Sequence, residues 1–208
     1  DSILLDGQKM DYSYQKYLAE NLLRLGGRYQ LQKKNDSAIF YYNKLAKLNS
    51  LIDETLDAQA TSYSNMSAIF QKDSTILNYN EKAIDYAERA IAIHKKRNKK
   101  LNEAGAINNL ASVYFNQGDF EKSKRAYFQG INLIKRDTTT RAIEIKAKLY
   151  YNLAWAMRNL KEYEAYDYQE ISYDMEDGLR DRETKEMLER VTGEYNVDVV
   201  RKAGEFEK

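Results

Sequence analysis

The sequence predicts an all-α fold in which about four helical hairpins stack on one another and a C-terminal helix follows them. The 208 residues include no proline and only nine glycines. Because proline interrupts helices and ordinary proteins contain about 5% of it, its absence indicates long helices joined by short polar turns. Equivalent positions also recur, since Leu25, Met66, Leu110 and Leu153 follow one another at intervals of 41, 44 and 43 residues. A nearly constant interval of this length is typical of stacked helical repeats.

The predicted elements follow from this register. A lead-in helix covers about residues 8–18, and four hairpins come after it, at about 19–52, 60–97, 104–137 and 147–180. We assign residues 1–178 to one repeat domain and residues 179–208 to a charged capping or linker helix. That last segment departs from the repeat because its apolar stripe is sparse. A polar outer face is what a terminal repeat needs for solubility.

The third predicted hairpin shows most clearly how the two helices of a repeat fit together. Ala111 and Ser123 are small enough to let two antiparallel helices approach closely, and Tyr114 and Tyr127 fill the space beside them. Gly118 lies in the turn between the helices, where it is free to take a left-handed backbone conformation. A single hairpin cannot bury both of its faces, so neighbouring hairpins are expected to share a continuous core.

These residues resemble the tetratricopeptide repeat, which has a small residue and an aromatic on its first helix, a glycine-containing turn and an alanine-led second helix. The resemblance covers about residues 19–180 and is strongest at 104–137. It implies a right-handed α–α superhelix, with the first helices lining a concave groove and the second helices forming the convex face. The chain departs from the family in lacking the closing proline and in exceeding the usual interval of about 34 residues. The longer interval is similar to that of variants in kinesin light chains and bacterial peptide-sensing regulators.

Composition and charge exclude several function classes. The 33 Lys and Arg against 32 Asp and Glu leave a net charge of +1, without the basic excess of a nucleic-acid module. The lack of cysteine and the single histidine, His94, argue against metal sites and a Ser–His triad. We expect His94 to be exposed, in a basic run at a helix end. No apolar run is long enough for a membrane span, and no nucleotide-binding or hydrolase motif is present. We therefore expect no catalysis and no cofactor.

Asparagine recurs once per repeat, at Asn65, Asn109 and Asn152, one residue before the interface Met or Leu. Its side chain offers both a donor and an acceptor, which match the backbone groups of an extended peptide. In long-spaced tetratricopeptide proteins, asparagines in this setting contact bound peptide, and the resemblance implies the same role for these three. The alternative is that each amide bonds to the backbone of a neighbouring helix or faces water.

Three such hydrogen bonds, at about 0.5–1.5 kcal/mol each, fall short of the roughly 8 kcal/mol that micromolar affinity needs. Aromatic anchors are therefore required, and Trp155 and Tyr151 are candidates. Arg158 and Lys148 would attract an acidic group, unless they merely form a solvated face. The complete candidate set for peptide or protein binding is Asn65, Asn109, Asn152, Asn108, Ser112, Asn116, Tyr151, Trp155 and Arg158.

The function expected from these residues is non-catalytic binding of a peptide or protein in the concave groove. The charged helix after the repeats resembles Bacteroidetes-type membrane-bound regulators, which implies a sensor segment, favours an extracytoplasmic location and places a membrane span after Lys208. The chain begins without Met and has no signal peptide, so we expect it to be part of a longer protein. The alternative is a structural scaffold or assembly adaptor that acts through the convex face or the ends. The ligand and the oligomeric state stay open.

Overall fold

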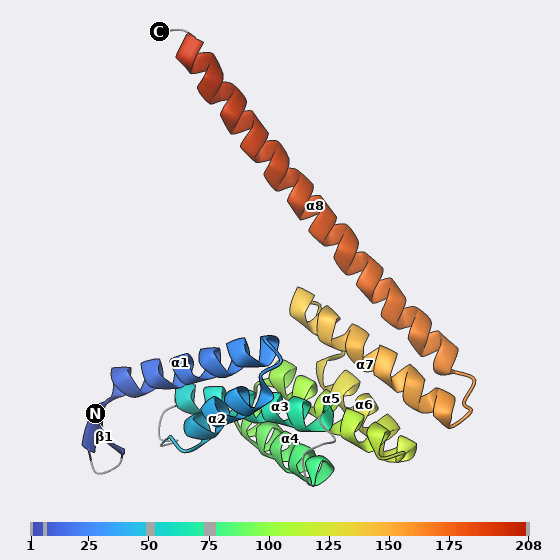
Figure 1. Cartoon of the computed structure of the whole chain (residues 1–208). Helices are drawn as coiled ribbons and strands as arrows, with labels where there is room; N and C mark the ends of the chain where they lie inside the picture. The colour runs from blue at the N-terminus through green and yellow to red at the C-terminus, as the bar shows by residue number, and fades with distance from the viewer. Residues whose placement is uncertain (1, 6–7, 49–52, 73–77, 207–208) are drawn as a thin grey trace.

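The fold is described by a computed structural model that covers residues 2–5, 8–48, 53–72 and 78–206. Its helices are α1 (Tyr12–Leu31), α2 (Asn35–Ala46), α3 (Asp53–Lys72), α4 (Tyr79–Lys96), α5 (Lys100–Asn116), α6 (Phe120–Ile134), α7 (Thr140–Asn159) and α8 (Ala165–Phe206). They pair as four hairpins, α1–α2 to α7–α8 (Figure 1). The all-α prediction is therefore confirmed. Residues 49–52, where the first predicted hairpin ends, lie outside the described residues, as do 207–208.

A short antiparallel β-hairpin precedes the first helix. Its strands are β1 (Ser2–Leu5) and β2 (Gln8–Asp11), with Ser2 opposite Asp11 and Leu5 opposite Gln8. The prediction of a lead-in helix over about 8–18 is therefore wrong for residues 8–11. From residue 12 onward the chain is helical, and this helix runs on without a break as α1.

The hairpins stack in two layers. The first helices contact one another in the order α1, α3, α5, α7, and each second helix also packs on the first helix of the next hairpin. The buried residues form clusters that cross from one hairpin to the next. One of them joins Ile107 of α5 and Ile131 of α6 to Leu149 and Leu153 of α7. Burying side chains of this size contributes about 1.5–3 kcal/mol each, so stability depends on stacking.

Close approach within a hairpin is secured by a serine that donates to an alanine carbonyl of the paired helix. Ser67 Oγ donates to the carbonyl of Ala83 at 2.8 Å, and Ser123 Oγ donates to that of Ala111 at 2.9 Å. The last hairpin uses Ser172 in the same way. All three serines are fully buried. The small residues predicted at Ala111 and Ser123 thus sit at the helix contact, where a larger side chain would separate the helices.

The turns at the ends of α1, α4, α5 and α7 place one residue in the left-handed conformation. Gly118 has a φ of 79°, as predicted, and the same conformation occurs at Lys33, Asn98 and Lys161. At each of these turns the following amide donates to the helix carbonyl five residues earlier, for example Asp119 N to Tyr114 O at 3.0 Å. This bond caps the helix C-terminus and sends the chain back antiparallel.

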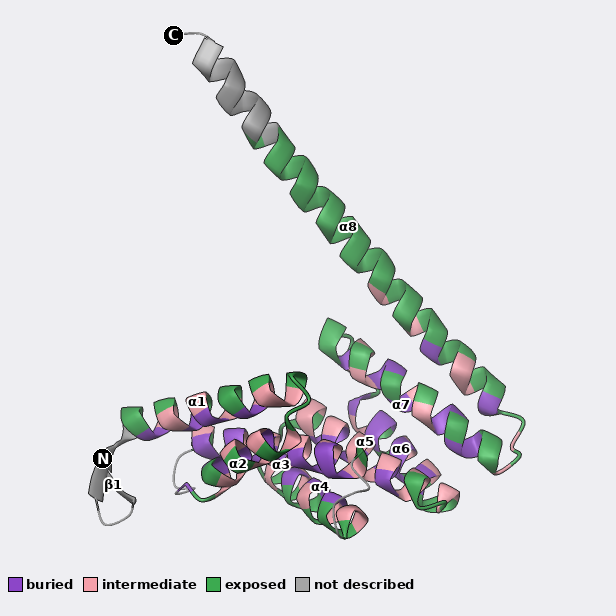
Figure 2. Cartoon of the chain, viewed as in Figure 1, coloured by how far each residue is buried: buried purple, intermediate pink, exposed green. Residues whose placement is uncertain are grey.

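The last helix, α8, extends well beyond the hairpin that it forms with α7. Its first part packs on α7, and from Arg180 onward every side chain that the structure describes is exposed (Figures 1 and 2). The predicted boundary between residues 178 and 179 falls inside this continuous helix, and the division into two segments stays a prediction. Among the described helices, none combines the length and the apolarity that crossing a membrane requires.

The tightest contact in the first hairpin yields a stability prediction. A Cβ added to Gly26 would overlap the ring of the buried Tyr42, whereas a Cβ on Gly105 would meet nothing within 4 Å. We expect Gly26→Ala to lower the free energy of unfolding by about 1–3 kcal/mol through overpacking. Gly105→Ala should raise it by about 0.5–1 kcal/mol, because alanine favours the helix. Urea titrations of both variants measure this, and equal effects would contradict the packing described here.

Candidate functional site

The first-helix layer carries a polar stripe on each of α3, α5 and α7. Along α7 the stripe consists of Arg141, Lys148, Asn152, Trp155 and Asn159, which are spaced so that they share one side of the helix. The corresponding residues on the other two helices are Asn102, Gly105, Asn109, Ser112 and Asn116 of α5 and Thr61, Ser64 and Gln71 of α3. These stripes line two hollows along the same three helices. We call their common surface the α3–α5–α7 face.

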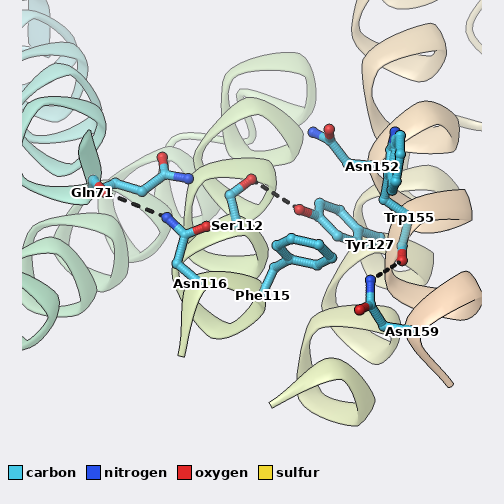
Figure 3. Close-up of a pocket in the computed structure, with 8 residues that line it drawn as sticks. All are labelled: Gln71, Ser112, Phe115, Asn116, Tyr127, Asn152, Trp155 and Asn159. Carbon is cyan, nitrogen blue, oxygen red and sulfur yellow. Dashed lines mark hydrogen bonds between the residues drawn. The ribbon is translucent and has the colours of Figure 1, made fainter. Parts of the chain in front are cut away.

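The first hollow lies at the C-terminal ends of the three helices and has a volume of about 420 Å³. We call it the aromatic pocket; it is lined by Gln71, Ser112, Phe115, Asn116, Tyr127, Asn152, Trp155 and Asn159 (Figure 3). Phe115, Tyr127 and Trp155 supply apolar surface, and amide groups surround them. The buried Tyr127 hydroxyl is within 2.9 Å of Ser112 Oγ, so the pocket wall has its own hydrogen bond. Apolar walls with a few polar groups are typical of binding pockets.

Trp155 is the exposed aromatic of this pocket, and its neighbours hold it in place. Its side chain is 40% exposed, and Tyr151 meets it edge-on with ring centroids 6.3 Å apart. The Arg158 guanidinium lies 4.8 Å from the Trp155 ring centroid and 5.6 Å from that of Tyr166 on α8. A cation over an aromatic face is attractive by about 0.5–1 kcal/mol at exposed sites. These contacts restrict the indole before any ligand arrives.

The asparagines of the stripes bond to the preceding first helix. Asn109 Nδ2 donates to the Ser64 carbonyl at 3.0 Å, and Asn152 Nδ2 donates to Asn108 Oδ1 at 3.0 Å. Asn116 Nδ2 reaches the Gln71 carbonyl at 3.4 Å. For Asn109 the alternative that the sequence left open, a bond to the backbone of a neighbouring helix, is thus observed, whereas Asn152 bonds to a side chain of that helix. Within the described part of the chain, the Oδ1 atoms of Asn109 and Asn152 accept no hydrogen bond, so an acceptor remains on each.

Asn65 stands apart from the other two members of the predicted asparagine ladder. It donates to the Tyr42 hydroxyl of α2 at 3.0 Å and lines neither hollow. Asn108, Tyr151 and Arg158 also lie outside both linings. Asn109, Ser112, Asn116, Asn152 and Trp155 are the predicted residues that the α3–α5–α7 face brings together. Whether any of them contacts a ligand stays a prediction.

Sequence reasoning missed other residues of the face. Gln71 and Asn159 line the aromatic pocket but were not predicted, and Tyr127 was assigned only to the core. Helical spacing could have identified Asn159. A step of three residues leads from Asn152 to Trp155, and a further step of four leads to Asn159, so all three lie on one side of the helix.

The second hollow lies in the N-terminal halves of α5 and α7 and has a volume of about 330 Å³. We call it the polar pocket; the lining residues that define its chemistry are Ser64, His94, Asn109, Arg141, Glu144 and Lys148. Ser64 Oγ is buried without a hydrogen-bond partner. Arg141 donates to Asn102 Oδ1 at 3.0 Å. The cationic Arg141 and Lys148 and the carboxylate of Glu144 thus line the same hollow as Ser64, whose Oγ has no hydrogen-bond partner.

The predicted exposure of His94 is wrong, because its side chain is 1% exposed. The residue lies in the last turn of α4 and lines the polar pocket, and its Nδ1 has no hydrogen-bond partner. Burial lowers the pKa of His94 below its ordinary value of 6.5; Asp57 opposes this shift and Lys99 adds to it. The imidazole is therefore neutral at pH 7.

With this geometry in view, the similarities to known proteins are informative. Residues 104–136, in the α5–α6 hairpin, match the sequence model of the family described as Tetratricopeptide repeat. No curated protein matches the chain. Among solved structures, the chain is similar to that described as "Crystal structure of MamA protein", with 18% identity, a TM-score of 0.39, and coverage of 77% of this chain and 92% of that chain.

The stacked hairpins and the matched repeat define a class, that of helical-repeat modules for protein interaction. More specifically, residues 104–136 carry a tetratricopeptide repeat, within the segment where the sequence resembles that family most strongly. Among the side chains that the structure describes, no group of three or more His, Cys, Asp or Glu residues is placed to hold a metal ion.

The asparagine bonds between first helices yield a second prediction. Asn109→Ala removes a bond to a carbonyl of the preceding helix and should lower the free energy of unfolding by about 0.5–1.5 kcal/mol. Asn21→Ala is the matched control, because the Asn21 amide makes an exposed bond to Tyr17 O within its own helix and not to another helix of the described residues. Its effect should stay within about 0.5 kcal/mol. Urea denaturation compares the two, and an Asn109 variant as stable as the wild type would refute the bond's role.

The neutral His94 predicts acid sensitivity. The unfolded chain takes up the proton near pH 6.5, but the folded chain resists it, so stability is present above that pH and is lost as the pH falls towards the lowered pKa. The chain has one histidine, and although burial also raises the pKa of Glu103, that carboxyl is common to the wild type and the His94 variant, so their comparison isolates His94. The melting temperature of the wild type should fall in this interval more steeply than that of His94→Gln. Parallel curves would show that His94 is not the cause.

Proposed function

We propose that the α3–α5–α7 face binds an extended peptide segment of a partner protein and that Trp155 is its principal anchor. The aromatic pocket is the observation that carries the proposal. It combines an exposed, restrained indole with amide groups from three helices. A peptide laid across these helices would place a side chain on the aromatic surface and its backbone beside the amides.

The available contacts are sufficient for weak to moderate affinity. Covering the exposed 40% of Trp155 buries about 60–100 Å² of ring, which contributes about 2 kcal/mol. A large peptide side chain in the pocket adds about 1.5–3 kcal/mol. Hydrogen bonds to the acceptors of Asn109 and Asn152 add about 1 kcal/mol each. Before the entropy lost on association is subtracted, the sum of about 5.5–7 kcal/mol sets a Kd of about 10–100 μM as the tightest expected.

A signalling role of the kind the sequence favours has a physical basis in the last hairpin. Arg158 lies over both Trp155 on α7 and Tyr166 on α8. A ligand that shifts the indole would disturb this shared contact and bias the position of α8. We therefore propose that the module is a ligand-sensing segment whose output passes through α8, as a population shift between two arrangements.

The test uses the intrinsic fluorescence of Trp155, the single tryptophan of the chain. Peptides are selected from a displayed library of random twelve-residue sequences and then titrated into the protein. We expect binding to shift the emission to shorter wavelength and to reduce quenching by acrylamide, because the indole leaves water. Trp155→Ala, measured by calorimetry, should weaken binding about thirtyfold.

Tyr195→Ala is the control, because Tyr195 is 68% exposed on the free part of α8 and far along the chain from the pocket. Affinity should be unchanged in that variant. If selected peptides bind both variants like the wild type, the groove proposal fails, and the scaffold alternative, with contacts on the convex face or the ends, is favoured. Replacing Asn109 and Asn152 together is a poorer test, because both residues also hold neighbouring helices.

A further inference from the structure

We infer that the projecting part of α8 packs antiparallel on the start of α8 in a second copy of this chain, so that two copies form a symmetric dimer. We call residues 165–179 the base of α8 and residues 180–206 its arm. In the earlier hairpins the second helix packs on the first helix of the next hairpin, as α6 does on α7. No helix of the described residues takes that place beside α8 (Figure 1).

One side of α8 carries an exposed apolar stripe, the α8 stripe, which continues from the base into the arm. Its members are between 48% and 68% exposed: Tyr166, Tyr173, Met187, Leu188, Val191 and Tyr195. They share one side of the helix because their spacings are close to multiples of 3.6 residues. The base packs on α7 through another side, where the Ser172 hydroxyl donates to the Ala147 carbonyl. The α8 stripe therefore faces away from the body of its own copy.

The two apolar ends of the α8 stripe match each other in length. Tyr166 and Tyr173 lie seven residues apart in the base, and Leu188 and Tyr195 lie seven residues apart in the arm. Each interval is about 10.5 Å of helix. An antiparallel pair with its two-fold axis between residues 180 and 181 places Tyr195 of one copy opposite Tyr166 of the other, and Leu188 opposite Tyr173. Each arm then covers the base of the other copy.

The charged middle of the α8 stripe sets the direction of pairing. In the antiparallel pair, Arg180 lies next to Asp181 of the other copy, and Lys185 lies next to Asp177. Lys185 and Asp181 form no ion pair with any residue that the structure describes. A parallel pair would instead bring Arg180 to Arg180 and Lys185 of the other copy, and like charges in contact are unfavourable. The charge pattern thus favours the antiparallel dimer.

The exposed area of the α8 stripe is sufficient for a dimer of moderate affinity. Its six side chains, each about half to two-thirds exposed, offer about 600 Å² per copy. Two copies would bury about 1,200 Å², which is the lower limit of specific protein interfaces. We therefore expect a dissociation constant of about 10 μM.

A membrane surface fits the arm less well than a second copy does. Helices that lie on membranes carry an excess of Lys and Arg on their polar face. Residues 180–196 contain four Lys and Arg against five Asp and Glu, so the arm has no such excess. Charges of both signs suit a surface that pairs with itself.

Sedimentation equilibrium of the 208-residue protein between about 1 and 100 μM tests the dimer. Val191→Glu should weaken dimerisation at least tenfold, because it places a carboxylate in the apolar contact, opposite Glu170 of the other copy. Val197→Glu is the matched control. Val197 is an equally exposed valine of the arm, but it lies six residues on and about 120° around the helix from Val191. Its variant should dimerise within twofold of the wild type.

A spin label on Gly193→Cys tests the direction. The chain has no other cysteine, Gly193 faces away from the α8 stripe, and an added Cβ there meets nothing within 4 Å. Antiparallel pairing separates the two labels by about 38 Å along the helices, whereas parallel pairing leaves them level. Electron–electron resonance should therefore give a distance above about 38 Å.

Three results would overturn the inference: a monomer at 100 μM, equal weakening by the Val191 and Val197 variants, or a label distance below about 30 Å. The inference stands apart from the proposed function, because no member of the α8 stripe lines the aromatic pocket or the polar pocket. Loss of peptide binding would leave the dimer untouched, and a monomeric protein would leave the peptide groove untouched.

Discussion

The structure depends on how closely the two helices of each hairpin approach. A buried serine hydroxyl that donates to an alanine carbonyl across the pair, as at Ser67, Ser123 and Ser172, leaves no room for larger side chains at the contact. The closely paired hairpins stack so that the first helices form one layer and the second helices the other. The first helices then lie next to one another, so that α3, α5 and α7 present their polar stripes to a common space. The site is therefore a consequence of the packing within each repeat.

The asparagines illustrate how one side chain can serve packing and binding at once. Asn109 and Asn152 use their amide hydrogens to link successive first helices, and their carbonyl oxygens stay unpaired within the described residues. An amide fixed in this way is oriented before a ligand arrives, which reduces the entropy lost on binding. Because these bonds link successive first helices, stacking alone explains why asparagine recurs at the repeat interval. The groove proposal consequently relies on Trp155 and its pocket, which stacking does not require.

Much of the fold was predictable because each hairpin carries its own signal. Helical spacing, the small residues at Ala111 and Ser123 and the turn glycine at position 118 are local properties, and the structure bears them out. Predictions that depended on tertiary context did less well. The basic run around His94 suggested an exposed helix end, but the imidazole is buried in a pocket that residues of α3, α5 and α7 also line. In the same way, the helical spacing along α7 was present in the sequence, yet only stacking shows that Asn159 shares a pocket with Gln71.

The free part of α8 gives the last hairpin a mechanical property. About 27 residues project beyond the body, which is about 40 Å of helix at 1.5 Å per residue. Such an arm converts rotation at its base into translation at its tip, and a tilt of about 5° moves the end by about 3.5 Å. A rearrangement of one or two side chains where α7 meets α8 would thus be magnified into a displacement comparable to the width of an atom. Arg158 and Tyr166 are in contact at the start of α8, where its packing on α7 begins.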